Sequence, residues 1–369
     1  MTIDRRSLLT GAVAAPLALG LSPAWGLGSP RAFVSACGDA AGRFSVKAVA
    51  ADGRLLSELT LPGRGHAATR RPGHNEVVVV ARRPGRFMLA VDPLAGDVIR
   101  QVEAAPGRHF YGHAAFSPDG RWLYATENAY EEGRGVVGLY DAAAGYLRVR
   151  ELPSHGVGPH ELALLADGRR LVVANGGIRT HPESGRRKLN LETMRPNLVY
   201  VDADSGALLR RLTLPGDLQR LSIRHMAVTA DDNVCLALQN EGPRDRLVPL
   251  VGRQRGEKPI VLMPGPDDGL RRMRHYAGGA ALDDGGSVLA VSAPRGGLVS
   301  FWSPQEGRWL GSLEVPDGCG LAAAGGAGRF AVSSGAGRLL IHDAFSGRTE
   351  TLRDDGRSGL AWDNHLLAV

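Results

Sequence analysis

The chain has 369 residues, 43% of them hydrophobic, and its 50 glycines indicate a globular protein rich in tight turns rather than long helices. The formal net charge of +6 comes almost entirely from arginine, because Lys47, Lys188 and Lys258 are the only lysines. The arginines are scattered among acidic residues and form no basic block, so the composition argues against nucleic-acid binding.

Residues 1–26 predict a twin-arginine export signal. The pair Arg5 and Arg6 is followed by Ser-Leu-Leu, and an apolar run then extends to Leu21 before a stretch of small residues. That run is too short for a comfortable membrane span, and no later segment offers the roughly 18 uninterrupted apolar residues that a span needs. We therefore expect a single domain, residues 27–369, without a membrane span, that is exported folded to the periplasm.

Two kinds of turn alternate along this domain at intervals of roughly forty to sixty residues, which is typical of propeller blades. The first kind is a tight hairpin containing Asp with Gly or Asn, as at 117–120, 166–168, 230–233 and 283–286. The second has Asp and Gly four positions apart, as at 92–96, 141–145, 202–206 and 343–347. The short segments between these turns are rich in β-branched residues, so each repeat predicts four strands.

Counting the repeats predicts an all-β fold, a seven-bladed β-propeller. Six blades are expected near 63–104, 107–153, 156–214, 220–263, 275–316 and 318–352. The seventh combines the two ends of the chain, with residues 358–363 as its inner strand and 32–62 as outer strands, so that no sheet edge is left open. The sequence leaves open whether 365–369 or 32–35 supplies its second strand.

Several histidines occupy equivalent positions in consecutive blades. The first strand of each blade lines the channel of a propeller, and counting back six residues from the first turn reaches His113, His225 and Glu161, with His160 beside it. His66 has the same spacing from the turn of its own blade. We therefore expect these side chains to meet at one mouth of the channel.

Imidazole and carboxylate groups are the usual ligands of iron, zinc, copper and manganese. The ring therefore predicts a metal site made by His66, His113, His160, Glu161 and His225. The alternative is a ring of polar groups that only binds water and satisfies strand ends.

The remaining blades do not continue this ring in the sequence. Their equivalent positions are near Gly278, Gly318 or Cys319, and Ser358, which leaves one side of the mouth open to a ligand. An insertion of about twenty residues, 176–197, is expected above this mouth, and such loops are often lids or binding loops.

Catalytic motifs are missing. The sequence has no Gly-x-Ser-x-Gly, and its glycine-rich stretch at 325–328 precedes no helix that would hold a phosphate, so we assign no catalytic residue. His160 with Glu161 would suit acid-base chemistry in a lactonase-like propeller. The three cysteines, Cys37, Cys235 and Cys319, are widely spaced, so buried free thiols are expected although an oxidising compartment permits a disulfide.

The chain resembles the DUF1513 family of exported bacterial propeller proteins, whose function is uncharacterised. The resemblance covers essentially the whole mature chain and is carried by Gly-His at 112–113, Gly-Pro-His-Glu at 158–161, Thr-His-Pro at 180–182, Lys-Leu-Asn-Leu at 188–191 and Arg-His at 224–225. The insertion containing 180–191 is distinctive, whereas Ser-Pro-Asp-Gly at 117–120 is common to many propellers.

Members of that family are often encoded beside imelysin-like periplasmic iron-uptake proteins and di-haem peroxidase-like proteins. The resemblance therefore implies a role in iron handling, with periplasmic iron-uptake proteins as partners. We expect a metal-binding or accessory protein, with iron as the ion and copper or zinc as alternatives. The other hypotheses are a lactonase-like or quinoprotein-like enzyme acting on a small ligand at the same mouth, and a protein-interaction scaffold.

Overall fold

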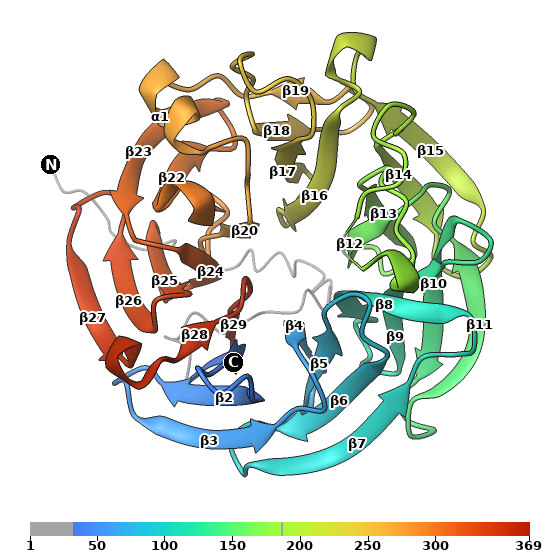
Figure 1. Cartoon of the computed structure of the whole chain (residues 1–369), viewed down its shortest axis with the longest axis horizontal. Helices are drawn as coiled ribbons and strands as arrows, with labels where there is room; N and C mark the ends of the chain where they lie inside the picture. Colours follow the sequence, from blue (N-terminus) through green and yellow to red (C-terminus); the bar gives the residue numbers. More distant parts are fainter. Residues whose placement is uncertain (1–31, 186) are drawn as a thin grey trace, which may run out of the picture.

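The computed structural model describes residues 32–185 and 187–369, which form seven antiparallel sheets arranged as blades around a central channel (Figure 1). In six sheets the four strands are consecutive in sequence, and the first of them lies nearest the channel. The predicted seven-bladed β-propeller is thereby confirmed. The predicted export signal, residues 1–26, lies outside the described residues.

The six consecutive blades have the following strands, given from the channel outwards. The first three are β4 (Gly65–Arg70), β5 (Val77–Ala81), β6 (Phe87–Asp92) and β7 (Asp97–Glu103); β8 (Arg108–Phe116), β9 (Trp122–Ala129), β10 (Arg134–Asp141) and β11 (Leu147–Pro153); and β12 (Pro159–Leu164), β13 (Arg170–Asn175), β14 (Asn197–Asp202) and β15 (Leu208–Thr213). The next three are β16 (Leu221–Val228), β17 (Val234–Asn240), β18 (Val251–Gln254) and β19 (Val261–Leu262); β20 (Gly279–Leu282), β21 (Leu289–Ala293), β22 (Leu298–Ser303) and β23 (Arg308–Glu314); and β24 (Gly318–Ala323), β25 (Arg329–Ser334), β26 (Arg338–Asp343) and β27 (Thr349–Asp354).

The seventh blade joins the two ends of the chain. Its outer strands are β1 (Ala32–Gly38), β2 (Phe44–Ala50) and β3 (Leu55–Thr60), and its inner strand consists of two short pieces, β28 (Ala361–Trp362) and β29 (Leu367–Ala368). Both pieces pair with β1, through Cys37 opposite Trp362 and Phe33 opposite Ala368. The second strand is therefore the N-terminal segment, which settles the question that the sequence left open.

In residues 32–185 and 187–369, helical structure is confined to short connections. These are α1 (Asp267–Arg272) and the 3-10 turns η1 (Pro182–Ser184), η2 (Gly216–Leu218), η3 (Pro294–Gly296) and η4 (Gly356–Ser358). Within the described ranges, none of the helices has the length and apolar character needed to cross a membrane.

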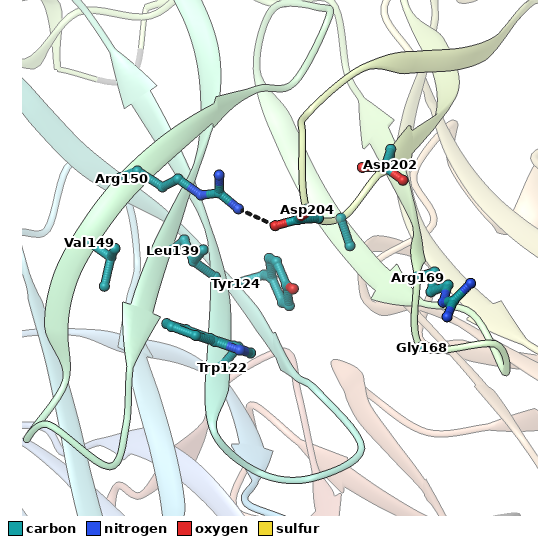
Figure 2. Close-up of a pocket in the computed structure, with 10 residues that line it drawn as sticks. Trp122, Tyr124, Leu139, Val149, Arg150, Gly168, Arg169, Asp202 and Asp204 are labelled. Atoms are coloured by element: carbon teal, nitrogen blue, oxygen red, sulfur yellow. Dashed lines mark hydrogen bonds and ion pairs between the residues drawn. The ribbon is translucent and has the colours of Figure 1, made fainter.

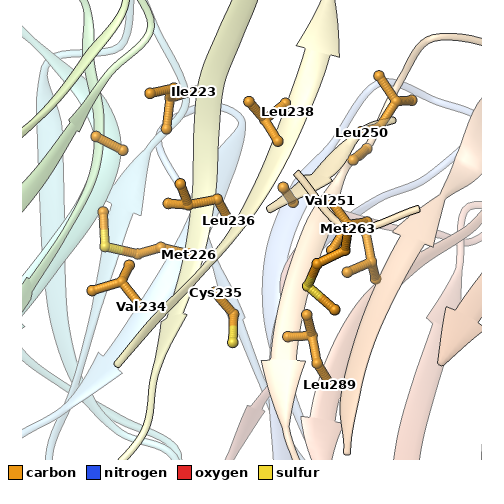
Figure 3. Close-up of a cluster of buried hydrophobic side chains, with 14 of the residues drawn as sticks. Ile223, Met226, Val234, Cys235, Leu236, Leu238, Leu250, Val251, Met263 and Leu289 are labelled. Atoms are coloured by element: carbon orange, nitrogen blue, oxygen red, sulfur yellow. The ribbon is translucent and has the colours of Figure 1, made fainter. Parts of the chain in front are cut away.

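The hydrophobic core lies between neighbouring blades. Figure 3 shows part of one cluster, in which Met226 and Leu236 lie on one face of their blade while Val251 lies on the other side, towards Leu289 of the next blade. All four side chains are buried, and truncating such residues to alanine typically costs about 2–5 kcal/mol. The three cysteines all lie in the described part of the chain, and each is buried and free, as expected.

Candidate metal centre

Five histidines from five neighbouring blades meet in the channel. His66, His113, His160 and His225 come from the inner strands β4, β8, β12 and β16, and His365 comes from the segment between β28 and β29. The first four are buried and His365 is partly buried. Contacting imidazole rings have centroids between 4.4 and 5.9 Å apart. The structure therefore brings the four sequence-predicted histidines together and adds a fifth.

Irregular pairing of the inner strands accompanies this convergence. The register shifts at 65–68, 110–114, 159–161 and 223–225, where His66, His113, His160 and His225 are located. A bulge lets residues leave the ladder and bends the strand, which changes the direction of its side chains. The blades thus place their imidazoles in the channel by departing from regular strand geometry at one equivalent level.

Gly112 allows two of these rings to pack closely. Its φ is +111°, a conformation that residues with a side chain rarely adopt. A Cβ at this position would lie 2.3 Å from Cδ2 of His66, so any side chain here would displace that imidazole. The sequence Gly112-His113 therefore contributes one ring directly and makes space for another.

Two carboxylates hold the outer sides of the imidazoles. Nδ1 of His66 lies 3.1 Å from Oδ1 of Asp363, and Nδ1 of His225 lies 3.1 Å from Oε2 of Glu161. The other oxygen of Glu161 is 3.7 Å from Nδ1 of His113. When Nδ1–H donates to a carboxylate, the ring is fixed in the tautomer whose Nε2 carries the free lone pair. Glu161 was predicted as a ligand, and the structure places its carboxylate against Nδ1 atoms rather than among the Nε2 atoms.

The inner nitrogens are close together and incompletely paired. Nε2 of His160 and Nε2 of His225 are 3.2 Å apart. Nε2 of His113, Nδ1 of His160 and Nε2 of His365 are buried and have no hydrogen-bond partner among the described residues. Leaving a buried polar atom unpaired costs about 1–3 kcal/mol. A ligand that pairs with these nitrogens would remove that cost, which favours its binding.

Two overlapping sets of three donors have the spacing of a metal site. They are His66 with His113 and His160, and His113 with His225 and His365, and the donor atoms within each set lie within 4.8 Å of one another. His113 belongs to both sets, so the five rings surround one common region.

Burial keeps the imidazoles neutral. It lowers the pKa of His66, and it lowers the pKa values of His113, His160, His225 and His365 well below the ordinary value, with the neighbouring rings and nearby arginines adding to the effect. Neutral imidazole is the form that coordinates metal ions. The cluster is therefore already deprotonated at neutral pH.

The two carboxylates differ in their environments. Burial raises the pKa of Glu161 to about 8, although the amide of Met226 donates to the same group and opposes the rise. Burial alone would also raise the pKa of Asp363, but the hydrogen bond from His66 and the charges of Arg82 and Arg64 outweigh it and hold this pKa far below its usual range. Asp363 is therefore a fixed negative charge beside the cluster.

A cavity of about 490 Å³ lies directly over the cluster and includes His66, His160 and His225 in its wall. The insertion after β13 reaches this cavity through Lys188, which forms an ion pair with Glu241. The insertion thus borders the channel mouth, where the sequence placed it.

A second cavity, of about 740 Å³, lies away from the channel between the blade β8–β11 and the blade β12–β15. Figure 2 shows Arg150 and Asp204 facing each other across it, and they form an ion pair at 2.9 Å. Its described lining residues include no imidazole and no thiol. The channel cavity is therefore the better candidate for chemistry.

The sequence missed His365, Asp363 and the partly buried Arg224. It also predicted Ser358 as the equivalent position of the seventh blade, which is wrong, because Ser358 ends the exposed turn η4 before the inner strand begins. The spacing rule fails there because this inner strand closes the chain and no first turn follows it. A signal was available in Asp363 and His365, two metal-site residue types at the end of a predicted inner strand.

Comparisons with known proteins give a family and a fold. A family model described as a protein of unknown function, DUF1513, matches residues 59–369. Hydrazine synthase of Kuenenia stuttgartiensis superposes with a TM-score of 0.61 at 13% identity, over 85% of this chain and 92% of that one. The U3-55K structure superposes with a TM-score of 0.57 at 14% identity, over 79% and 81%. At such identities the two structures show the propeller fold alone, and a comparison with curated proteins gives no match.

Proposed function

The chain belongs to the DUF1513 family, whose function is unknown, and from this premise we propose that it binds a metal ion among the five channel imidazoles. One observation carries the proposal. Carboxylates hold Nδ1 of His66 and His225, which makes Nε2 of each ring the nitrogen that carries a lone pair. Nε2 of His225 lies 3.2 Å from Nε2 of His160, and three further ring nitrogens nearby are buried with no partner in the described chain. In protein metal sites, a histidine ligand usually donates its other ring N–H to a carboxylate in this way.

The distances support this assignment. With metal–nitrogen bonds of about 2.0–2.1 Å, two donors of a tetrahedral site lie about 3.3 Å apart, and two donors on opposite sides of an ion lie about 4.2 Å apart. Nε2 of His160 and of His225 are 3.2 Å apart, and each set of three donors lies within 4.8 Å.

Bound water is the competing occupant. A water molecule donates at most two hydrogen bonds, so it satisfies at most two of the lone pairs that converge here. A cation interacts favourably with all of them, and it would also stabilise the ionised form of Glu161, whose pKa burial raises to about 8. An ion that binds several of these nitrogens at once is therefore the occupant that we propose.

Iron is the ion that we propose, with copper and zinc as alternatives. Imidazole donors suit all three, and an identical site usually binds copper more tightly than ferrous iron. The choice of iron is supported by the neighbourhood in which members of this family are encoded. The sequence of residues 1–26 supports export of a folded protein, and we propose the periplasm as the location and iron-uptake proteins as partners.

Elemental analysis tests the proposal most directly. The mature protein would be purified from the periplasm without chelators and without a histidine tag, and its iron, copper and zinc would be quantified. Near-stoichiometric metal that is lost in the double variant His113→Ala/His225→Ala supports the site and identifies the ion. His342→Gln is the matched control, because His342 is buried on β26 and its Nδ1 lies 2.8 Å from Oγ1 of Thr349, outside the cluster. A protein that stays metal-free after incubation with these ions contradicts the proposal and favours the small-ligand enzyme or the scaffold.

A further inference from the structure

We propose that the cavity above the imidazole cluster binds a small multivalent oxyanion, a carboxylate- or phosphate-bearing molecule, with Arg224 as a principal contact. This inference concerns the charge of the cavity wall and does not require the ion of the proposed function. The wall carries six cationic side chains, Arg64, Arg82, Arg83, Lys188, Arg224 and Arg295, but only two acidic ones, Glu241 and Asp317.

The nearby acids do not neutralise this wall. Glu241 is already paired with Lys188, and burial raises the pKa of Asp317, which makes its negative charge less stable. Asp363 lies just below the wall and is shared between Arg64, at 2.5 Å, and Arg82, at 3.7 Å. The described lining of this cavity therefore contains more cationic than acidic side chains.

Arg224 carries the inference furthest. It belongs to the irregular part of β16 beside His225, and it lines the cavity. Its Nε is buried and without a hydrogen-bond partner, and no carboxylate of the described residues forms an ion pair with it. A buried N–H without an acceptor is costly, and a bound oxyanion would supply that acceptor.

The shape and chemistry of the cavity define the ligand class. Its volume of about 490 Å³ falls within the usual range for small-molecule sites. Guanidinium groups bind carboxylates and phosphates through two parallel N–H donors, and arginines form most of the cationic wall. The side chain of Arg295 lies 4.2 Å above the ring of Tyr276, which holds its charge at the rim. The site therefore suits a compact molecule with several anionic oxygens.

The same wall bears on how an ion would reach the imidazoles. A free divalent cation entering through this cavity would be repelled by the arginines, whereas an anionic complex would be attracted. The oxyanion would then lie between the ion below and the guanidinium groups around it. This part of the inference rests on the proposed function, so the experiment separates it from anion binding alone.

The experiment measures binding of citrate and of inorganic phosphate to metal-free protein by isothermal titration calorimetry. We expect dissociation constants that rise with salt, and at least a tenfold weakening in Arg224→Gln and in Arg295→Gln. Arg271→Gln is the control, because Arg271 is an exposed residue of α1 that pairs with Asp267 outside the cavity. Binding of citrate alone or of phosphate alone identifies the anionic group.

The outcomes separate the two proposals. The variant His113→Ala/His365→Ala changes two cluster imidazoles that do not line the cavity, so it should still bind the anion in the absence of metal, and a failed metal site leaves this inference intact. If neither anion binds wild-type protein, or if Arg224→Gln and Arg295→Gln bind both as tightly as Arg271→Gln does, the inference is overturned. Circular dichroism and thermal unfolding of each variant exclude misfolding as the cause of weak binding.

Discussion

Nε2 of His160 and Nε2 of His225 lie 3.2 Å apart in the channel, although 65 positions and a blade boundary separate the two residues. His160 lies on β12 and His225 lies on β16, so the two rings come from the inner strands of different blades. The contact is made possible by irregular pairing in both inner strands and by Glu161, which holds the far nitrogen of the His225 ring. The spacing of these two nitrogens already resembles that of two ligands bound to one metal ion.

The first prediction concerns the fifth imidazole. His365→Gln should weaken metal binding at least tenfold, because Nε2 of His365 is one of the buried nitrogens without a partner in the described chain and it belongs to one of the two donor sets. Competition with a chromophoric chelator would measure the affinity. An affinity equal to that of wild type would restrict the site to the four inner-strand histidines.

The second prediction concerns the carboxylate behind His66. Asp363→Asn should weaken metal binding about 10–100-fold without removing a ligand, because the amide no longer fixes the His66 tautomer. It should also lower the free energy of unfolding by about 2 kcal/mol, since Arg64 and Arg82 lose their shared partner. Metal titration and urea unfolding measure the two effects.

The control for this carboxylate is Glu58→Gln, at an ion pair with Lys47 whose glutamate is 48% exposed. Glu58→Gln should change neither the metal affinity nor the free energy of unfolding appreciably, because exposed ion pairs contribute about 0–1 kcal/mol to stability. If Asp363→Asn loses stability but keeps full metal affinity, Asp363 supports the fold and does not position His66.

The third prediction separates a steric effect from backbone strain. Gly112→Ala should both destabilise the protein and abolish tight metal binding, because the new Cβ would lie 2.3 Å from the His66 ring. Gly107→Ala is the matched substitution, with φ of +70° and no described atom within 4 Å of the added Cβ. It should cost about 1–3 kcal/mol through strain and leave metal binding unchanged. Equal metal loss in both variants would show that global destabilisation is the cause.

The fourth prediction concerns pH and a histidine outside the cluster. His109 is buried, its Nδ1 lies 3.0 Å from the carbonyl oxygen of Phe110, and its Nε2 lies 3.0 Å from the Asn128 amide nitrogen. Burial lowers its pKa to about 4, against an ordinary value near 6.5. Between these two values the unfolded chain binds a proton on His109 that the folded protein does not bind. The contribution of His109 to the free energy of unfolding is therefore present above about pH 6.5 and is lost as the pH falls towards 4.

Integrating the difference in proton binding between the unfolded and folded states predicts that the free energy of unfolding falls by about 3 kcal/mol between pH 7 and pH 4 because of this one residue. In urea unfolding of metal-free protein, His109→Gln should lose about 3 kcal/mol less than wild type over the same interval. The other buried histidines are present in both proteins and cancel in the comparison. Identical losses would show that His109 does not contribute to acid sensitivity.

The sequence alone determined the number of blades and most of the ring. Tight turns with Asp and Gly are local features, and their chemistry is legible without knowledge of the fold. Because the first strand of each blade occupies the same place around the channel, a fixed spacing from the turn also predicted that His66, His113, His160 and His225 would meet. That reasoning works only where a blade is continuous in sequence.

Only the tertiary structure decided the rest of the centre. Asp363 and His365 are two positions apart in the blade that joins the two chain ends, and no turn spacing applies to an inner strand that is split and terminal. The orientation of Glu161 towards Nδ1 atoms depends on the bulge at 159–161, which is a property of strand pairing. The cationic cavity depends on Arg64, Arg82, Lys188 and Arg224. Nothing in the sequence distinguishes these residues from the many other scattered basic residues. Closure of the propeller places them around one opening.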